Sequence, residues 1–246
     1  MIEASAAMLD QGHGRRLAIM QPYFFPYIGY FQLVAAVDRF VFYDDVAFMK
    51  QGWINRNRLL LSGRPSWFTL PVSGASSNRK INELSVQPGD VWRRKMLASV
   101  RQSYGRAPYF EQAYGLLAGI LLSDECSLSA LARRSVVDLS RYMGLETEFV
   151  VSSGRYGNEG MQGAERVLDI CRRERATEYH NLPGGKALYS VEQFAAAGVE
   201  LCFVEPNPME YMQMEAPFKP FLSMLDVLMF NERSTLLPLL QTESAR

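Results

Sequence analysis

The sequence predicts an α/β protein with a mostly parallel sheet flanked by helices and an additional helical part. Two patterns support this fold class. A strand, a loop, a helix and a second strand follow one another near the start, and strands alternate with helices again after residue 145. A length of 246 residues with 48% hydrophobic residues is enough for a substantial core in a single domain.

The first predicted unit is a strand, a helix and a second strand. Residues 17–20 form a short apolar run, which ends at Gln21-Pro22 because proline donates no hydrogen bond to a sheet. Apolar side chains spaced by three and four then predict a helix over 27–37, followed by an extended apolar run over 39–43. In open α/β sheets, ligands bind beyond the carboxyl ends of the strands. We therefore expect the loops after these two strands to face one cleft.

The middle of the chain is predicted to leave the sheet. Short β-prone runs separated by glycine- and serine-rich turns favour a hairpin-like excursion over 58–62, 66–72 and 81–86. Three helices should follow, over 90–104, 108–122 and 127–143. Asp90 and Ser127 stand where helix N-caps are expected, and Gly144 stands where the third helix should end.

The last part of the chain returns to alternating strands and helices. The predicted strands are 146–151, 177–180 and 199–205, and the predicted helices are 163–173, 191–197 and 218–229. This alternation favours a mostly parallel sheet. We therefore expect a flexible leader at 1–16, one α/β domain over 17–231 with a helical part at about 90–144, and a C-terminal tail at 232–246.

Composition narrows the expected partners and compartment. Lysine plus arginine equals aspartate plus glutamate at 26 each, so no global charge favours nucleic acid or an acidic membrane surface. Cys126, Cys171 and Cys202 lie far apart without a CxxC pattern, and the chain has only two histidines, which disfavours a structural zinc site; the cysteine usage indicates a reducing compartment. The longest apolar runs, such as 114–122, are shorter than the roughly 20 residues of a transmembrane helix. We expect a cytoplasmic protein without a membrane span.

Six aromatic residues fall within nine positions after the first strand. They are Tyr23, Phe24, Phe25, Tyr27, Tyr30 and Phe31. One interpretation is a packed loop and helix start. However, a short loop has too little inward surface to bury all six, and buried tyrosine hydroxyls need partners. Some of these rings should therefore line a pocket that stacks a ring of a ligand.

Charged residues after the second strand are candidates for catalysis and anion binding. Asp44 and Asp45 either form a solvated turn or hold a substrate amine or hydroxyl, and the alternative of a magnesium site lacks a third acidic ligand. The segment 50–58, KQGWINRNR, combines cations, amides and a tryptophan, which suits an anionic small molecule. A basic surface turn and an RNA contact are the alternatives for this segment.

Two later loops are further candidates. The run 78–80, NRK, lies in a serine- and glycine-rich loop whose backbone amides can form an anion cradle. The run 180–186, HNLPGGK, follows a predicted strand and begins with the one histidine outside the leader. His180 is either a structural histidine or, at the carboxyl end of a strand, a proton acceptor.

Long motifs connect these segments to a known family. They are MQPYFFPYIGYFQL, DRFVFYDDVAFMKQGWINRNR, SSNRKINEL, WRRKMLASVRQSYGRAPYF, ERVLDIC, GGKALYS and LSMLDVLMFN. Together they resemble the WbqC-like family of bacteria over about residues 17–231. The positions characteristic of that family carry over to Gln21, Pro22, Tyr23, Pro26, Gly29, Tyr30, Asp44, Asp45, Trp53, Asn55, Arg56, Asn78, Lys80, Gly184 and Gly185.

The resemblance implies a setting in glycan assembly. Family members are encoded near genes for O-antigen and other surface polysaccharides, which implies a cytoplasmic enzyme modifying a nucleotide-linked sugar or a related intermediate. The first unit also resembles the layout of nucleotidylyltransferases, with Tyr27 and Tyr30 at the two histidine positions of their HxGH motif. Tyrosine carries no positive charge at neutral pH, which puts adenylyl transfer in doubt.

We therefore expect a transferase that acts on an activated sugar or amine with a nucleotide- or phosphate-bearing co-substrate, preferably by acyl or aminoacyl transfer to an amino sugar. The alternatives are a non-catalytic module that binds a nucleotide-sugar or a partner enzyme, and a nucleotidylyltransferase-like enzyme. The expected catalytic residues are Asp44, Asp45 and His180. The expected substrate-binding residues are Gln21, Tyr23, Tyr27, Tyr30, Lys50, Trp53, Asn55, Arg56, Asn78, Lys80, Asn181, Gly184 and Gly185.

Overall fold

The main sheet confirms the predicted α/β fold class. The computed structural model describes residues 14–207, 209–214, 217–241 and 244–245. In this part of the chain a sheet has the strand order β10-β9-β8-β1-β2-β7, and all neighbours are parallel except β10, which is antiparallel to β9. Its strands are β1 (Arg15–Met20), β2 (Arg39–Phe42), β7 (Glu148–Val150), β8 (Ala176–Asn181), β9 (Glu200–Val204) and β10 (Ser244–Ala245).

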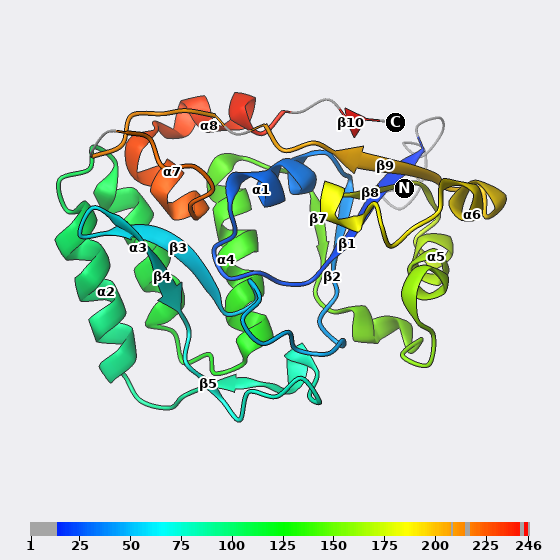
Figure 1. Cartoon of the computed structure of the whole chain (residues 1–246), viewed down its shortest axis with the longest axis horizontal. Coiled ribbons are helices and arrows are strands. Elements are labelled where there is room, and N and C mark those ends of the chain that lie inside the picture. Colours follow the sequence, from blue (N-terminus) through cyan, green and yellow to red (C-terminus); the bar gives the residue numbers. More distant parts are fainter. Residues whose placement is uncertain (1–13, 208, 215–216, 242–243, 246) are drawn as a thin grey trace, which may run out of the picture.

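Helices cover both faces of this sheet (Figure 1). The covering helices are α1 (Ile28–Ala35), α4 (Leu128–Met143), α5 (Gly163–Arg173) and α6 (Val191–Ala196). Alternating strand residues divide between two cores: Ala18 and Phe40 pack into the core that includes α1 and α4, whereas Leu17 and Val41 pack into the core that includes α5 and α6. Each β-strand thus presents one apolar face to each helical layer, as expected for a buried parallel sheet.

The excursion between β2 and β7 builds a second structural layer beside α4. It contains the hairpin β3 (Arg56–Leu61) and β4 (Arg64–Thr69), the short pair β5 (Val72–Ser73) and β6 (Ser85–Val86), the 3-10 helix η1 (Ile81–Glu83), and the helices α2 (Val91–Tyr104) and α3 (Phe110–Leu121). Near the chain end, α7 (Met224–Phe230) and α8 (Arg233–Leu239) join this layer. The remaining 3-10 helices are η2 (Ser153–Tyr156) and η3 (Pro183–Gly185).

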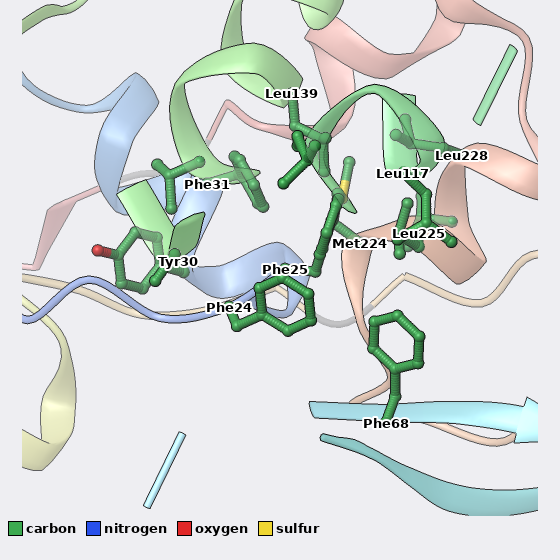
Figure 2. Close-up of a cluster of buried hydrophobic side chains, with 14 of the residues drawn as sticks. Phe24, Phe25, Tyr30, Phe31, Phe68, Leu117, Leu139, Met224, Leu225 and Leu228 are labelled. Carbon is green, nitrogen blue, oxygen red and sulfur yellow. The ribbon is translucent and has the colours of Figure 1, made fainter. Parts of the chain in front are cut away.

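Aromatic packing fixes the loop after β1 against this second layer. Phe24 stacks on Phe68 of β4 with ring centroids 5.5 Å apart, and Phe25 packs edge-on against Phe24. Figure 2 shows these rings beside leucines of α3, α4 and α7. The Phe25 backbone adopts a positive φ of 43°, and its amide donates a hydrogen bond of 2.8 Å to Ser135 Oγ. The loop at the end of β1 is therefore held from several sides, which fixes the residues that follow it.

Several predicted boundaries differ from the structure. The predicted strand over 81–86 is instead the 3-10 helix η1 followed by the two-residue β6, because Glu83 accepts a hydrogen bond from the Lys80 amide and closes a turn. The predicted helix over 218–229 begins only at Met224, where the Ser223 side chain caps it. The predicted caps at Ser127 and Gly144 are observed, and Asp90 occupies the N-cap position without a side-chain hydrogen bond.

The chain ends also differ from the prediction. Residues 1–13 of the expected leader lie outside the described residues, and β1 already begins at Arg15. In the expected tail, α8 packs Leu236 into the core. The division into domains otherwise stays a prediction. None of the helices in the described part of the chain combines the length and apolarity that crossing a bilayer requires.

Candidate functional site

A pocket of about 840 Å³ lies at the carboxyl ends of β1, β2 and β8. Its walls include Gln21 after β1, Tyr43 after β2 and Asn181 at the end of β8. The chain runs from β1 to β2 on one side of β1 and returns to β8 on the other, so the strand order reverses here. Ligands of open α/β sheets bind at such a reversal, and pockets for small molecules measure about 300–1,000 Å³. Position and size both indicate a ligand site.

Aromatic side chains form much of the pocket wall. They are Tyr23, Tyr27, Tyr43, Trp53, Tyr189 and Phe221. Burial raises the pKa of the four tyrosine hydroxyls, so these groups stay protonated near neutral pH. The wall therefore combines flat apolar surface with neutral hydroxyls, a combination that suits a ligand with a ring and polar substituents.

The motif PYIGY positions one of these rings. Tyr27 precedes the first residue of α1, and Gly29 lies in the first turn of that helix. A Cβ added at Gly29 would lie 2.5 Å from Tyr27 Cε2 and 2.9 Å from Pro206 Cβ, closer than side chains pack. Glycine at this position therefore lets the Tyr27 ring lie against the helix, where it borders the pocket.

The loop after β8 forms the opposite wall. Asn181 is buried, and its side-chain oxygen accepts a hydrogen bond of 2.8 Å from the Leu182 amide. A Cβ added at Gly185 would lie 2.5 Å from Asn181 Nδ2, so glycine permits the close approach of η3 to this amide. No atom lies within 4 Å of an added Cβ at Gly184, which leaves the backbone of η3 open at the pocket.

Arg58 of β3 is the one charged side chain among the described residues that line the pocket. Its Nη2 is 3.4 Å from the Phe221 carbonyl oxygen, and the neighbouring Asn57 side chain accepts a hydrogen bond of 2.8 Å from the Arg58 amide. Arg58 Nε is buried and has no hydrogen-bond partner among the described residues. As the charged group of this wall, the Arg58 guanidinium marks a position where a ligand anion would be favourable.

The two predicted aspartates, Asp44 and Asp45, do not line the pocket. Asp44 accepts a hydrogen bond of 2.6 Å from Ser129 Oγ and a second from Ser152. Asp45 accepts from Ser153 and forms an ion pair with Arg166, whose side chain is 4% exposed. Both carboxylates thus tie the end of β2 to α4, η2 and α5.

Tyr43 connects this acidic network to the pocket. The Arg166 guanidinium carbon lies 4.8 Å from the centre of the Tyr43 ring. Arg166 Nε also donates to the Asn158 side-chain oxygen at 3.0 Å, which fixes the guanidinium in place. The network therefore supports a pocket wall from behind and has the geometry of a positioning element.

The predicted histidine lies on the other face of β8 from Asn181. Side chains alternate along a strand, and His180 pairs in register with Ala18, whose side chain belongs to the core of α1 and α4. His180 Nε2 is 2.9 Å from Glu178 Oε2. Burial lowers the pKa of the imidazole, partly offset by the Glu178 carboxylate. His180 does not line the pocket.

The remaining predicted residues are used in local structure or lie outside the pocket. Arg56 donates to the Gly52 carbonyl oxygen at 3.2 Å, and its guanidinium carbon lies 4.0 Å from the centre of the Trp67 ring. Lys80 forms an ion pair of 2.7 Å with Glu159. Asn55 Nδ2 donates to the Leu70 carbonyl oxygen at 2.9 Å. The Tyr30 hydroxyl donates to the backbone carbonyl oxygen of Gln21 at 2.8 Å. Lys50 and Asn78 are exposed on the surface.

The structure therefore brings about half of the predicted site together. The residues that line the pocket are Gln21, Tyr23, Tyr27, Trp53, Asn181, Gly184 and Gly185. Those placed elsewhere are Tyr30, Asp44, Asp45, Lys50, Asn55, Arg56, Asn78, Lys80 and His180. The tyrosine at the second HxGH position, Tyr30, is fully buried and thus cannot contact a phosphate in the pocket.

The pocket also contains residues that the predicted site did not single out, although Asn57, Arg58, Leu182 and Pro183 lie within the candidate segments 50–58 and 180–186. They are Ile19, Met20, Tyr43, Met49, Asn57, Arg58, Leu182, Pro183, Leu188, Tyr189, Pro206 and Phe221. Tyr43 had a usable signal, because it directly follows a buried strand of the parallel sheet. Tyr189, Pro206 and Phe221 come from segments far apart in the sequence, and no local pattern marks them.

Comparisons with known proteins place the chain in a family. The family model described as "WbqC-like protein family" matches residues 21–236. The chain is also 30% identical over 217 residues to the uncharacterized protein Rv1507c of Mycobacterium tuberculosis, a match that covers 87% of this chain and 93% of that protein. A comparison with solved structures found none that matches. The chain belongs to the WbqC-like protein family.

Proposed function

We propose that the pocket binds a nucleotide-linked sugar, or a related compound that combines a ring with a phosphate. In this proposal the protein is a cytoplasmic transferase that acts on this ligand in the assembly of bacterial surface polysaccharide or a related glycan. The observation that carries this proposal is Arg58, the one charged side chain among the described residues that line an otherwise uncharged, largely aromatic pocket. A guanidinium binds phosphate oxygens through directed hydrogen bonds, and desolvation strengthens them.

The aromatic wall supports the second half of the ligand. Tyr23 and Tyr27 lie beside the loop after β1, and Trp53 approaches from the segment before β3. Flat rings of this kind stack on a nucleobase or on the apolar face of a sugar. Gln21 and Asn181 add amide groups that can donate to and accept from sugar hydroxyls.

The reaction we favour is acyl or aminoacyl transfer to the amine of a sugar. In that transfer the amine nitrogen forms a bond to the acyl carbon, the donor group leaves with the electron pair of its broken bond, and the proton lost by the amine passes to this leaving group. The tyrosine hydroxyls of the pocket can orient the acyl oxygen as neutral donors.

A non-catalytic binding module is the second candidate, and one observation favours it. Among the described residues that line the pocket there is no carboxylate and no imidazole, the groups that most often accept a proton in transfer reactions. Such a module would hold a nucleotide-sugar for a partner enzyme without changing it.

The experiment that tests the proposal has two stages. Thermal unfolding of the purified protein is first measured with uridine, guanosine and thymidine diphosphate sugars, because a ligand at 100 times its Kd adds about 2.7 kcal/mol of stability. Any stabilising amino sugar is then incubated with acyl and aminoacyl donors, and products are identified by mass spectrometry. Stabilisation followed by a new sugar amide supports the transferase. Stabilisation without product supports the binding module, and no stabilisation by any nucleotide-sugar overturns both.

A further inference from the structure

Three potential metal ligands lie together on one face of the sheet, away from the pocket. They are Glu178 and His180 of β8 and Cys202 of β9. β8 and β9 are neighbouring parallel strands, and His180 pairs in register with Cys202. Glu178 precedes His180 by two residues, so its side chain emerges from the same face of the sheet. The strand register thus brings together three donor groups that are separated by up to 24 positions in the sequence.

The donor atoms are close enough to share a cation. His180 Nε2, Cys202 Sγ and a Glu178 carboxylate oxygen all lie within 4.8 Å of one another, and the nitrogen and the oxygen are 2.9 Å apart. Metal–ligand distances of about 2.0–2.3 Å place the donors of a tetrahedral zinc site about 3.3–3.8 Å apart. A rotamer adjustment of about 1 Å therefore converts this cluster into the ligand set of a tetrahedral ion.

The chemistry of the donors selects the class of cation. An imidazole, a thiolate and a carboxylate together suit Zn²⁺, whereas Mg²⁺ and Ca²⁺ prefer oxygen ligands alone. His180 and Cys202 are 3% and 2% exposed, and the Glu178 side chain is 33% exposed. The cluster is thus buried at His180 and Cys202 and partly open to solvent at Glu178, the side from which a cation has access.

A cation beside the cluster, Arg16, is neutralised by its own partner. Arg16 belongs to the neighbouring strand β1 and pairs in register with Glu178 of β8. Its guanidinium donates to both Asp38 oxygens, at 2.6 Å from Nη2 and 3.4 Å from Nε. The Arg16–Asp38 pair therefore adds little net repulsion for a divalent ion. By contrast, the carboxylates of Asp44 and Asp45, which follow β2, are already bound by serines and Arg166.

We propose that Glu178, His180 and Cys202 bind one Zn²⁺ ion, or a cation of similar preference, that joins β8 to β9. The ion lies on the face of β8 opposite to the Asn181 side chain. Its ligand His180 directly precedes Asn181, where the pocket-lining loop begins. Its role is to fix the end of β8 and hence the position of that loop. The proposal does not depend on which ligand the pocket binds.

The test uses the full-length protein after removal of metal with a chelator. Zn²⁺ is titrated in competition with a chromophoric chelator, and Co²⁺ is titrated while its thiolate charge-transfer absorption is recorded. We expect one equivalent of either ion to bind. Cys202→Ser should abolish the cobalt–thiolate absorption, and Glu178→Gln should weaken Zn²⁺ binding at least tenfold, as loss of a ligand does.

The two other cysteines provide matched controls. Cys171 is buried in α5, and Cys126 is exposed before α4. Cys171→Ala and Cys126→Ser should leave the stoichiometry and the cobalt spectrum unchanged. Because Glu178 is partly exposed, Glu178→Gln keeps the test valid even if Cys202→Ser does not fold, which circular dichroism of the metal-free protein reveals. The proposal is overturned if the protein binds no stoichiometric Zn²⁺, or if a folded Glu178→Gln variant binds it with unchanged affinity.

Discussion

The pocket and the neighbouring acidic network use polar groups in opposite ways. Both lie beyond the carboxyl ends of parallel strands, and Tyr43 belongs to the pocket while Asp44 and Asp45 belong to the network. In the network the carboxylates are paired with serines or with Arg166. In the pocket, Arg58 Nε has no partner among the described residues. The charges of the network are satisfied internally, whereas the charge that we propose for ligand binding stands alone in its pocket among the described lining residues.

This difference shows that charged residues next to a pocket in the sequence need not line it. Two adjacent aspartates after a buried strand look catalytic in the sequence, yet their burial is compensated by partners from three other elements. The pocket beside them is mostly apolar and contains a single cation among its described lining residues. The predictions below test this separation between structural and ligand-binding charges.

The largest expected effect is on stability, from Arg166→Met. This change leaves the buried Asp45 carboxylate without its cation, and breaking a buried pair costs about 3–5 kcal/mol. Chemical unfolding measures the loss. Arg172→Met is the matched control, because the Arg172 side chain is 72% exposed and its pair with Asp169 contributes about 0–1 kcal/mol. Equal losses for the two variants would contradict a structural role for the network.

A buried carboxylate next to the network should make stability depend on pH. Burial alone would raise the pKa of Glu174, but hydrogen bonds from Tyr156 and Arg39 outweigh it and lower the pKa below the usual 4.5. A lowered pKa in the folded state stabilises the fold above the pKa of the unfolded chain, and this stabilisation disappears as pH falls through the folded-state pKa. At pH 7, Glu174→Gln should therefore lose about 1.5–3 kcal/mol of unfolding free energy.

The difference between wild type and Glu174→Gln should shrink as the pH falls below about 4.5. Urea unfolding at a series of pH values checks this, with Glu146→Gln as the control because Glu146 lies on the surface before β7 without a described ion pair. A difference that stays constant down to acidic pH would show that the carboxylate is not the group responsible.

In the pocket, a change to the aromatic wall should alter binding and leave stability nearly intact. Trp53→Ala should reduce the binding free energy of a nucleotide ligand by about 1–3 kcal/mol, the usual contribution of base–aromatic stacking. Trp67→Ala is the matched control, because the Trp67 ring lies 5.5 Å from Trp53 but does not line the pocket. Isothermal titration calorimetry measures the ligand affinity of both variants beside the wild type. Equal affinity losses would mean that the rings act through loop structure and make no contact with the ligand.

The smallest expected effect belongs to Lys80→Ala. Lys80 pairs with Glu159 on the surface and lies outside the pocket, so this variant should bind the ligand as wild type does and unfold at nearly the same temperature. A large loss of ligand affinity, measured in the same calorimetric series, would mean that the ligand extends to the loop 78–80.

Local signals in the sequence predict the fold better than the site. The strand runs of the main sheet, the Ser127 cap and the left-handed Gly144 at φ 85° are determined by neighbouring residues, and each appears in the structure. The predicted helix over 218–229 is shorter because Ser223 caps it from within. Such boundaries depend on competition between local signals, which a pattern of apolar residues does not resolve.

The site depends on contacts between distant segments. Arg56 and Arg58 are the same residue type two positions apart on β3, yet Arg56 binds the carbonyl oxygens of its own loop and Arg58 lines the pocket. The difference arises because the loop before β3 turns back over Arg56 while the segment around Phe221 packs beside Arg58. Neither contact leaves a signal in the local sequence.

The most direct test of this account is the binding of a nucleotide-sugar to Arg58→Gln and Arg56→Gln, measured by titration calorimetry beside the wild-type protein. The account predicts that Arg58→Gln loses about 1.5–3 kcal/mol of binding free energy, the contribution of a hydrogen bond to a charged group, with little change in the unfolding temperature. Arg56→Gln should bind nearly as wild type does. Unchanged affinity in a folded Arg58→Gln variant would contradict the central claim that this pocket binds its ligand through Arg58.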